Sequence, residues 1–142
     1  NDQPAKQWDD LVDNPTVAVE VAFTNQGNQN IFVGFEGALM KTSNNGDDWK
    51  QVIDGHVNGL RFFYGIGKSG HNENHMYAGG WLKGMAQQSL VLYISRDSGE
   101  TWEEKMYEAE QRGGLFTIKV ASDNSGHRIF VGLDGGGVYE IK

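Results

Sequence analysis

The sequence predicts an all-β protein built from repeated units of four short strands. Two stretches, 42–49 and 95–102, place a hydroxyl group, an Asx side chain, a glycine and a tryptophan at the same offsets, as a repeat does. The 142 residues include 20 glycines and two prolines, and 11% are aromatic. This composition suits short strands joined by tight turns, and no amphipathic run is long enough to predict a helix.

Three units follow one another along the chain. The expected strands are 17–23, 31–34, 38–42 and one from Trp49; then 60–66, 75–79, 90–95 and one from Trp102; then 115–121, 128–132 and 137–141. The second strands align on Gly34, Gly79 and Gly132, which are 45 and 53 residues apart. Four strands at this period are typical of β-propeller blades, so we expect blades at about 15–54, 55–108 and 109–142.

The first residues of the chain read as a detached strand. Residues 7–12 resemble the stretches that begin at Trp49 and Trp102, whereas the last unit has no such stretch after its third strand. We expect residues 1–14 to close the last blade. Three blades cannot form a ring, because propellers have about 4–8 of them. The chain is therefore expected to form a six-bladed ring as a homodimer by strand addition, or to be a fragment of a longer propeller.

Charge and composition exclude several classes of partner. The net charge is −7 and the isoelectric point is about 4.9, which opposes binding to nucleic acid or to an anionic membrane surface. No apolar run approaches the length needed to span a membrane, so membrane insertion is not expected. The chain has no cysteines, which excludes disulfides and thiol chemistry but leaves the compartment open.

The repeated turn resembles a known motif, the Asp-box or bacterial neuraminidase repeat. Its second copy is the fuller match, with Ser95, Asp97, Gly99 and Trp102. The first copy has Thr42, Asn44, Gly46 and Trp49, with asparagine in place of the aspartate. The whole chain is most similar to Asp-box propellers of the photosystem II assembly-factor and sortilin type, and less similar to sialidases and xyloglucan-degrading hydrolases.

The resemblance implies a structural role for these eight residues. The Asx side chain is expected to cap backbone N–H groups of its own turn, and the tryptophan to pack between sheets. The family also implies an extracytoplasmic location, periplasmic or secreted. Sialidases need three arginines for the substrate carboxylate. Of the four arginines here, Arg96 lies in a turn and Arg128 begins a second strand, so sialidase activity is not favoured.

In a propeller, the loops after the second strands and between blades form one face, which is where ligands generally bind. The longest of these loops is expected at 81–89 and carries Trp81 and Lys83. Glu36 and Asp134 take equivalent places in two units. They are either solvated loop acids or, less expectedly, a glycosidase pair or a cation site.

Further candidates come from the strands that would line the channel. Arg61 and Tyr64, with Glu20 and Lys119, are polar members of the first strands, and alternation should turn about two of the four inward. Arg112 lies on a connection between blades. His71 and His75 are four residues apart, but that spacing converges on a metal only in a helix, and they lie in a hairpin turn. No catalytic, metal or cofactor site is predicted.

The sequence thus favours a non-catalytic binding or assembly module that presents its loop face to a protein or carbohydrate. The alternative is an extracellular glycoside hydrolase, sialidase-like or glucan-degrading, or a fragment of one. A hydrolase would need two facing carboxyl groups, whereas a binding module needs only an aromatic-rich rim. A purely structural assembly module is a third possibility.

Overall fold

The computed structural model describes residues 16–23, 29–57, 59–83, 89–107, 114–123 and 126–141. Within these residues the regular elements are all strands, which confirms the all-β prediction. The strands are β1 (Thr16–Phe23), β2 (Gln29–Phe35), β3 (Ala38–Thr42), β4 (Lys50–Asp54), β5 (Leu60–Lys68), β6 (Met76–Lys83), β7 (Leu90–Ser95), β8 (Glu103–Tyr107), β9 (Leu115–Asp123), β10 (Gly126–Leu133) and β11 (Val138–Ile141).

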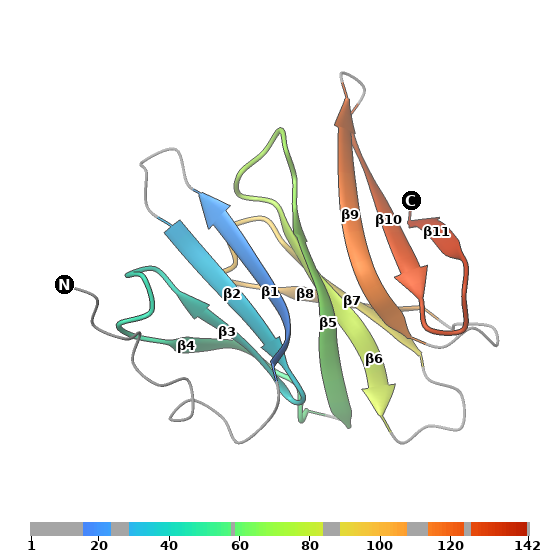
Figure 1. The fold of residues 1–142 in the computed structure, drawn as a ribbon, viewed down its shortest axis with the longest axis horizontal. Helices are drawn as coiled ribbons and strands as arrows, with labels where there is room; N and C mark the ends of the chain where they lie inside the picture. Colours follow the sequence, from blue (N-terminus) through green and yellow to red (C-terminus); the bar gives the residue numbers. More distant parts are fainter. Residues whose placement is uncertain are drawn as a thin grey trace.

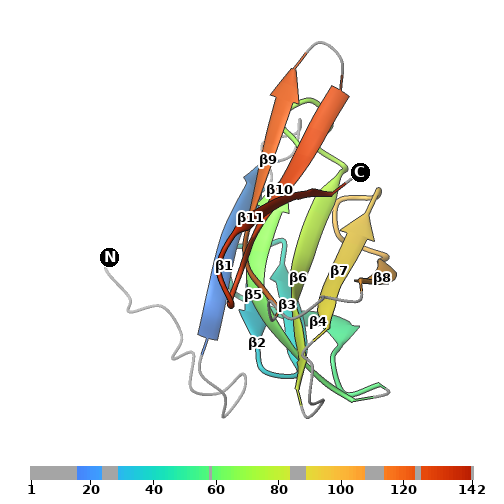
Figure 2. The ribbon, with the colours of Figure 1, turned by 90° about the vertical axis from the view of Figure 1, so that its right-hand side faces the viewer.

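The strands form three antiparallel sheets in which each strand pairs with the next one along the chain. The first sheet has the order β1-β2-β3-β4, the second β5-β6-β7-β8 and the third β9-β10-β11. Figure 1 shows the second sheet between the other two, and Figure 2 shows the same stack from the side. β5 packs against β1 on one side and β9 on the other, so the first strands of the three sheets are neighbours.

Two apolar cores hold the stack together. One lies between the first and second sheets and contains Phe32, Leu39, Phe63 and Tyr93 among its buried members. The other lies between the second and third sheets, around Leu92. The sheets therefore pack face to face through alternate residues of each strand, as stacked sheets do. A third buried cluster lies on the outer face of the first sheet: Val33, Phe35, Ala38 and Met40.

The pairing between first and second strands confirms the predicted alignment of the three second strands. Gly34 is paired with Ala18, Gly79 with Gly65 and Gly132 with Thr117, so each glycine faces the same place on the first strand of its sheet. The three sheets are thus copies of one unit, as the repeat indicated.

Some strand limits differ from the expectation. β6 continues through Lys83, so Trp81 lies in a strand that pairs with both β5 and β7 and not in a loop. Trp49 and Trp102 directly precede β4 and β8 and close the turns before them. Residues 1–14, and with them the predicted closing strand, lie outside the described residues, as does Arg112. In the described part of the chain, no helix is long and apolar enough to cross a membrane.

Candidate functional site

Four aromatic side chains gather where the second and third sheets meet. They are Phe62 and Tyr64 of β5, Trp81 of β6 and Phe116 of β9, and we call them the aromatic patch. The ring centroids of Tyr64 and Trp81 are 4.7 Å apart, and those of Tyr64 and Phe116 are 5.1 Å apart in a stacked arrangement. Phe62 lies 5.9 Å from both Tyr64 and Trp81, so the four rings form one continuous group.

Two β-bulges place the central rings of this patch. In β5, Phe63 pairs with Gly80 and Gly65 with Gly79, which leaves Tyr64 as the extra residue. In β9, Phe116 is the extra residue in the same way, opposite the step from Gly132 to Leu133 of β10. A bulge re-aims the side chain that it carries. The two bulged residues come from equivalent places in neighbouring sheets, and their rings stack.

The aromatic patch is accessible at its surface. Phe116 is 50% exposed, and Phe62, Tyr64 and Trp81 are half-buried. The third sheet begins tightly against Trp81, because a Cβ atom on Gly114 would lie 1.9 Å from the Cβ of Trp81. The patch therefore crosses the seam between two sheets, with one side packed and the other open. Such a surface can stack against the apolar face of a ligand.

The predicted rim acids lie beside this patch. Glu36, which follows β2, forms an isolated bridge with Phe62. Asp134, which follows β10, donates its backbone N–H to the carbonyl of Gly114, two residues before Phe116. The structure thus brings Glu36, Asp134, Tyr64 and Trp81 to one region.

Lys83 ends β6 opposite Leu60 in the same region, but its side chain lies outside the described residues. The same holds for the side chain of Glu20, whereas Lys119 is exposed on β9 opposite Phe130.

Arg61, one of the four residues considered for the channel, is buried and paired within the chain. Its side chain is only 4% exposed, and its guanidinium pairs with both carboxylate oxygens of Glu104, at 2.8 and 3.0 Å. It also donates to the backbone carbonyl of Val57, and Tyr93 donates its hydroxyl to Glu104. We therefore exclude Arg61 from the candidate site, since its donors are already used within the chain.

The pKa shifts of this group agree with a structural role. Burial works against the charge of Glu104, but the hydrogen bonds from Arg61 and Tyr93 outweigh it and lower the pKa of Glu104. Burial and the bond to Glu104 raise the pKa of Tyr93. A tyrosine with a raised pKa at a buried position is unsuited to act as a nucleophile near neutral pH.

The two tryptophan-terminated turns have the same internal hydrogen bonds. In the first Trp turn, residues 42–49, the side-chain oxygen of Asn44 accepts from the backbone N–H of Asp48 at 2.9 Å, and Thr42 Oγ1 accepts from the N–H of Gly46 at 3.0 Å. The indole N–H of Trp49 donates to the carbonyl of Gly46 at 3.1 Å. The Asx side chain thus caps its own turn, as the resemblance implied.

The second Trp turn, residues 95–102, repeats each of these contacts. Asp97 accepts from the N–H of Thr101 at 2.9 Å, and Ser95 Oγ accepts from the N–H of Gly99 at 2.8 Å. The indole N–H of Trp102 donates to the carbonyl of Gly99 at 3.2 Å. Burial opposes ionisation of Asp97, but its hydrogen bonds from Thr101, Ser95 and Glu100 prevail and lower its pKa to about 2.

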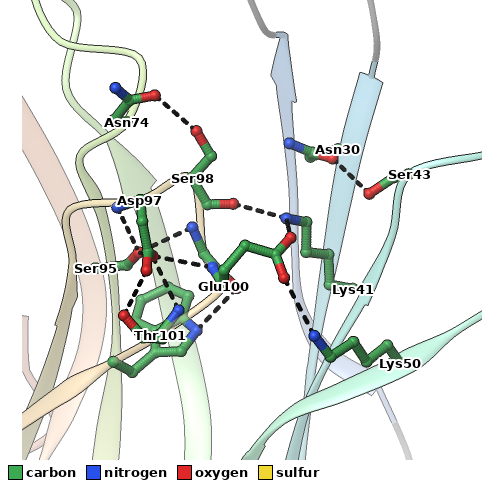
Figure 3. A network of polar contacts seen from close by, with 12 residues as sticks. Asn30, Lys41, Ser43, Lys50, Asn74, Ser95, Asp97, Ser98, Glu100 and Thr101 are labelled. Carbon is green, nitrogen blue, oxygen red and sulfur yellow. Dashed lines mark hydrogen bonds and ion pairs between the residues drawn. The ribbon is translucent and has the colours of Figure 1, made fainter.

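The second Trp turn also docks on the first sheet (Figure 3). Lys41 of β3 donates to the carbonyl of Ser98 at 2.8 Å and pairs with Glu100 at 2.5 Å. Trp102 meets Phe32 edge to face, with centroids 6.2 Å apart. These contacts make the turn part of the scaffold between two sheets.

No group of three or more histidine or carboxylate side chains within the described ranges is arranged to hold a metal ion. The stacked rings of Tyr64, Trp81 and Phe116 suit this face to apolar stacking, and the backbones of Glu36 and Asp134 adjoin it.

Comparison with solved structures identifies the type of fold. The crystal structure of an ancestral GH74 enzyme matches with a TM-score of 0.67 and 18% identity, over 88% of this chain and 17% of that chain. The GH74 xyloglucanase from Xanthomonas campestris matches with a TM-score of 0.62 and 15% identity, over 89% of this chain and 20% of that chain. These enzymes have β-propeller-type folds, so the likeness supports the same fold type for the three sheets. The chain spans about a fifth of the structures that it matches.

No protein-family model and no curated protein matches the chain.

Proposed function

We propose that the chain is a carbohydrate-binding unit of a β-propeller and that the aromatic patch is its contact surface. The observation that carries this proposal is the group of four rings across the seam of two sheets, with centroids 4.7–6.1 Å apart and Phe116 50% exposed. Sugar rings have apolar C–H faces that stack on aromatic side chains. A row of rings suits a chain of sugars better than a single small molecule.

A carbohydrate is favoured over a protein ligand by the nature of the structural neighbours. Both are GH74 enzymes, and one is named a xyloglucanase. The net charge of −7 also suits a neutral ligand better than an acidic one. The proposal includes an extracytoplasmic location, which the resemblance to Asp-box propellers also implied.

Binding is tested by affinity electrophoresis and calorimetry on a panel of soluble polysaccharides that includes xyloglucan. Phe116→Ala should weaken binding about 2–10-fold, because one stacking contact contributes about 0.5–1.5 kcal/mol. Met106→Ala is the matched control, since Met106 is equally exposed, at 50%, but lies on β8 away from the patch. Equal binding by both variants, or no binding to any polysaccharide, would refute the proposal.

A second candidate function is hydrolysis by a larger protein of which this chain is a part. It is favoured by the GH74 neighbours, of which the chain covers 17% and 20%. Glu36 and Asp134 are acidic residues whose backbones contact the strands that carry the aromatic patch or the residue just before them. Release of reducing ends from xyloglucan that is lost in Glu36→Gln or Asp134→Asn would favour this candidate over simple binding.

A further inference from the structure

The outer face of the third sheet carries residues that the other two sheets bury. The register makes Leu39, Leu92 and Val138 equivalent, because each pairs with the repeated glycine of its second strand. Leu39 and Leu92 are 0% exposed in the cores between sheets, whereas Val138 is 73% exposed. The third sheet thus presents a core position to solvent.

The second strands also show a residue that is buried in the first two sheets and more exposed in the third. Phe32, Tyr77 and Phe130 are equivalent, two residues before the repeated glycines. Phe32 and Tyr77 are buried, each on the face that meets the following sheet. Phe130 is only half-buried and lies on the outer face, because its neighbours Ile129 and Val131 point into the core with the second sheet. The outer face is therefore patterned for contact with another sheet.

The third sheet also differs from the other two at its edge, where a fourth strand could be added. The described third sheet has three strands and ends at β11, whereas the first and second sheets each add a strand that begins just after a tryptophan. The chain contains one more such stretch, Trp8 followed by Asp9, Asp10, Leu11 and Val12.

The connections indicate where that stretch belongs. β4 leads through residues 55–59 to β5 of the next sheet, and β8 leads through 108–114 to β9. The stretch 8–12 leads through three residues to β1 in the same way. By this pattern it is the fourth strand of a sheet that precedes the first one, on the side away from the second sheet.

The third sheet of the same chain cannot be the sheet that residues 8–12 join. The four backbone steps from Val12 to Thr16 span about 14 Å at most. The first and third sheets lie on opposite sides of the second (Figure 1), and stacked sheets are about 10 Å apart, which separates them by about 20 Å. The sheet that residues 8–12 would join is therefore not the third sheet of the same 142 residues.

We propose that a second copy of this chain covers the third sheet, adding its residues 8–12 beside β11, and that the exchange is reciprocal. This inference goes beyond carbohydrate binding and is independent of it. It places Asp10 of the second copy opposite Tyr139, as Glu104 of β8 lies opposite Tyr93 of β7. Tyr93 donates to Glu104, so the same tyrosine–carboxylate contact would form between the two chains. Two chains of three sheets would together give the six-bladed ring.

The first test is the solution mass of the 142-residue chain by light scattering over a range of concentrations. We expect about twice 15.7 kDa. Val138→Lys should weaken the dimer at least about tenfold, because it places a charge in the interface. Val57→Lys is the matched control, since Val57 is also exposed, at 56%, but lies on the connection to β5. A monomer at every concentration, or a dimer unaffected by Val138→Lys, would overturn the proposal.

The second test uses the absence of cysteine from the chain. Residues directly opposite in antiparallel strands have Cα atoms about 4.5–5.5 Å apart, within reach of a disulfide. The double variant Asp10→Cys/Tyr139→Cys should oxidise to a covalent dimer. A mixture of the two single variants should give one crosslinked pair, while Glu103→Cys with Tyr139→Cys should not. A crosslink within one chain, or none at all, would contradict exchange between two copies.

Discussion

The two Trp turns share their internal hydrogen bonds but differ in their surroundings. Each has a hydroxyl that accepts a glycine N–H, an Asx oxygen that accepts a backbone N–H, and an indole that donates to the glycine carbonyl. The second turn also contacts a neighbouring sheet through Lys41 and Phe32. The indole of the first turn packs instead on the cluster at the outer face of the first sheet.

This difference distinguishes two contributions to stability: the hydrogen bonds within each turn, and the contacts between a turn and a neighbouring sheet. The hydrogen bonds within a turn depend on residues at most four positions apart, so they form wherever the short motif occurs. The docking of a turn depends on the side chains of the neighbouring sheet. For the second Trp turn these are Lys41, which is 5% exposed, and Phe32, whose ring centroid lies 5.6 Å from Lys41 Nζ. The motif thus shapes the turn, and tertiary contacts make one copy an element of the interface between sheets.

The largest effect is expected from replacing the glycines of the turns. Gly99 and Gly46 both have positive φ, 79° and 92°, so alanine costs about 1–2 kcal/mol at either place. A Cβ on Gly99 would also lie 2.4 Å from the ring of Phe32, whereas one on Gly46 meets nothing closer than 3.8 Å. Gly99→Ala should therefore destabilise the chain by about 1–3 kcal/mol more than Gly46→Ala in urea unfolding. Equal losses would show that docking on Phe32 adds nothing.

The next effect concerns the two lysines that bind Glu100. Lys41→Met should lower the free energy of unfolding by about 1–3 kcal/mol, because the carbonyl of Ser98 loses its donor in a largely buried place. Lys50→Met is the control, since Lys50 is 66% exposed and its pair with the same carboxylate should contribute less than about 0.5 kcal/mol. Thermal and urea unfolding measure both, and a larger loss for Lys50→Met would reverse the comparison.

A smaller effect is expected from the capping side chains. Asp97→Ala should cost about 1–2 kcal/mol and Asn44→Ala about 1 kcal/mol, as losses of Asx caps do. Asp97 accepts from two backbone N–H groups, of Glu100 and Thr101, whereas Asn44 accepts from one, of Asp48. Neither variant should change polysaccharide binding, because both turns lie away from the aromatic patch. A binding defect without a stability loss would assign these turns to the site.

The same contrast between local and distant contacts explains which features the sequence could predict. The strands, the turns and the alignment of Gly34, Gly79 and Gly132 follow from short motifs at a fixed period, and the structure confirms them. Trp81 and Tyr64 were predicted as site residues, but their meeting with Phe116 depends on two bulges. A bulge is a property of the register between two strands and leaves no clear mark in the composition of either.

Arg61 shows the same limit. Its partner Glu104 is 43 residues away, so the sequence offered a cationic residue on a first strand but no sign that it was already paired. The extension of β6 through Lys83 likewise depends on pairing, since Trp81 and Lys83 lie opposite Phe62 and Leu60 of β5. Phe62 and Phe116 were not predicted as site residues, because single aromatic residues in strands usually belong to a core.

The smallest expected effect is a pH dependence that belongs to the second Trp turn alone. The pKa of Asp97 is about 2 in the fold against 3.8 for an ordinary aspartate. As the pH falls below about 4, the unfolded chain takes up this proton before the folded chain does, so stability is lost progressively toward pH 2. Asp97→Asn should remove this part of the slope, and the first turn already functions with Asn44 at the equivalent place.

Unfolding midpoints of the two proteins between pH 2.5 and 7 make the comparison. Lowered pKa values at other carboxyl groups, such as Glu100 and Glu104, act in both proteins, so only the difference between the curves reports Asp97. We expect the curves to run parallel above pH 5 and to converge as the pH falls. Parallel curves over the whole range would mean that the charge of Asp97 adds nothing to the cap, and that the carboxylate and the amide are equivalent in this turn.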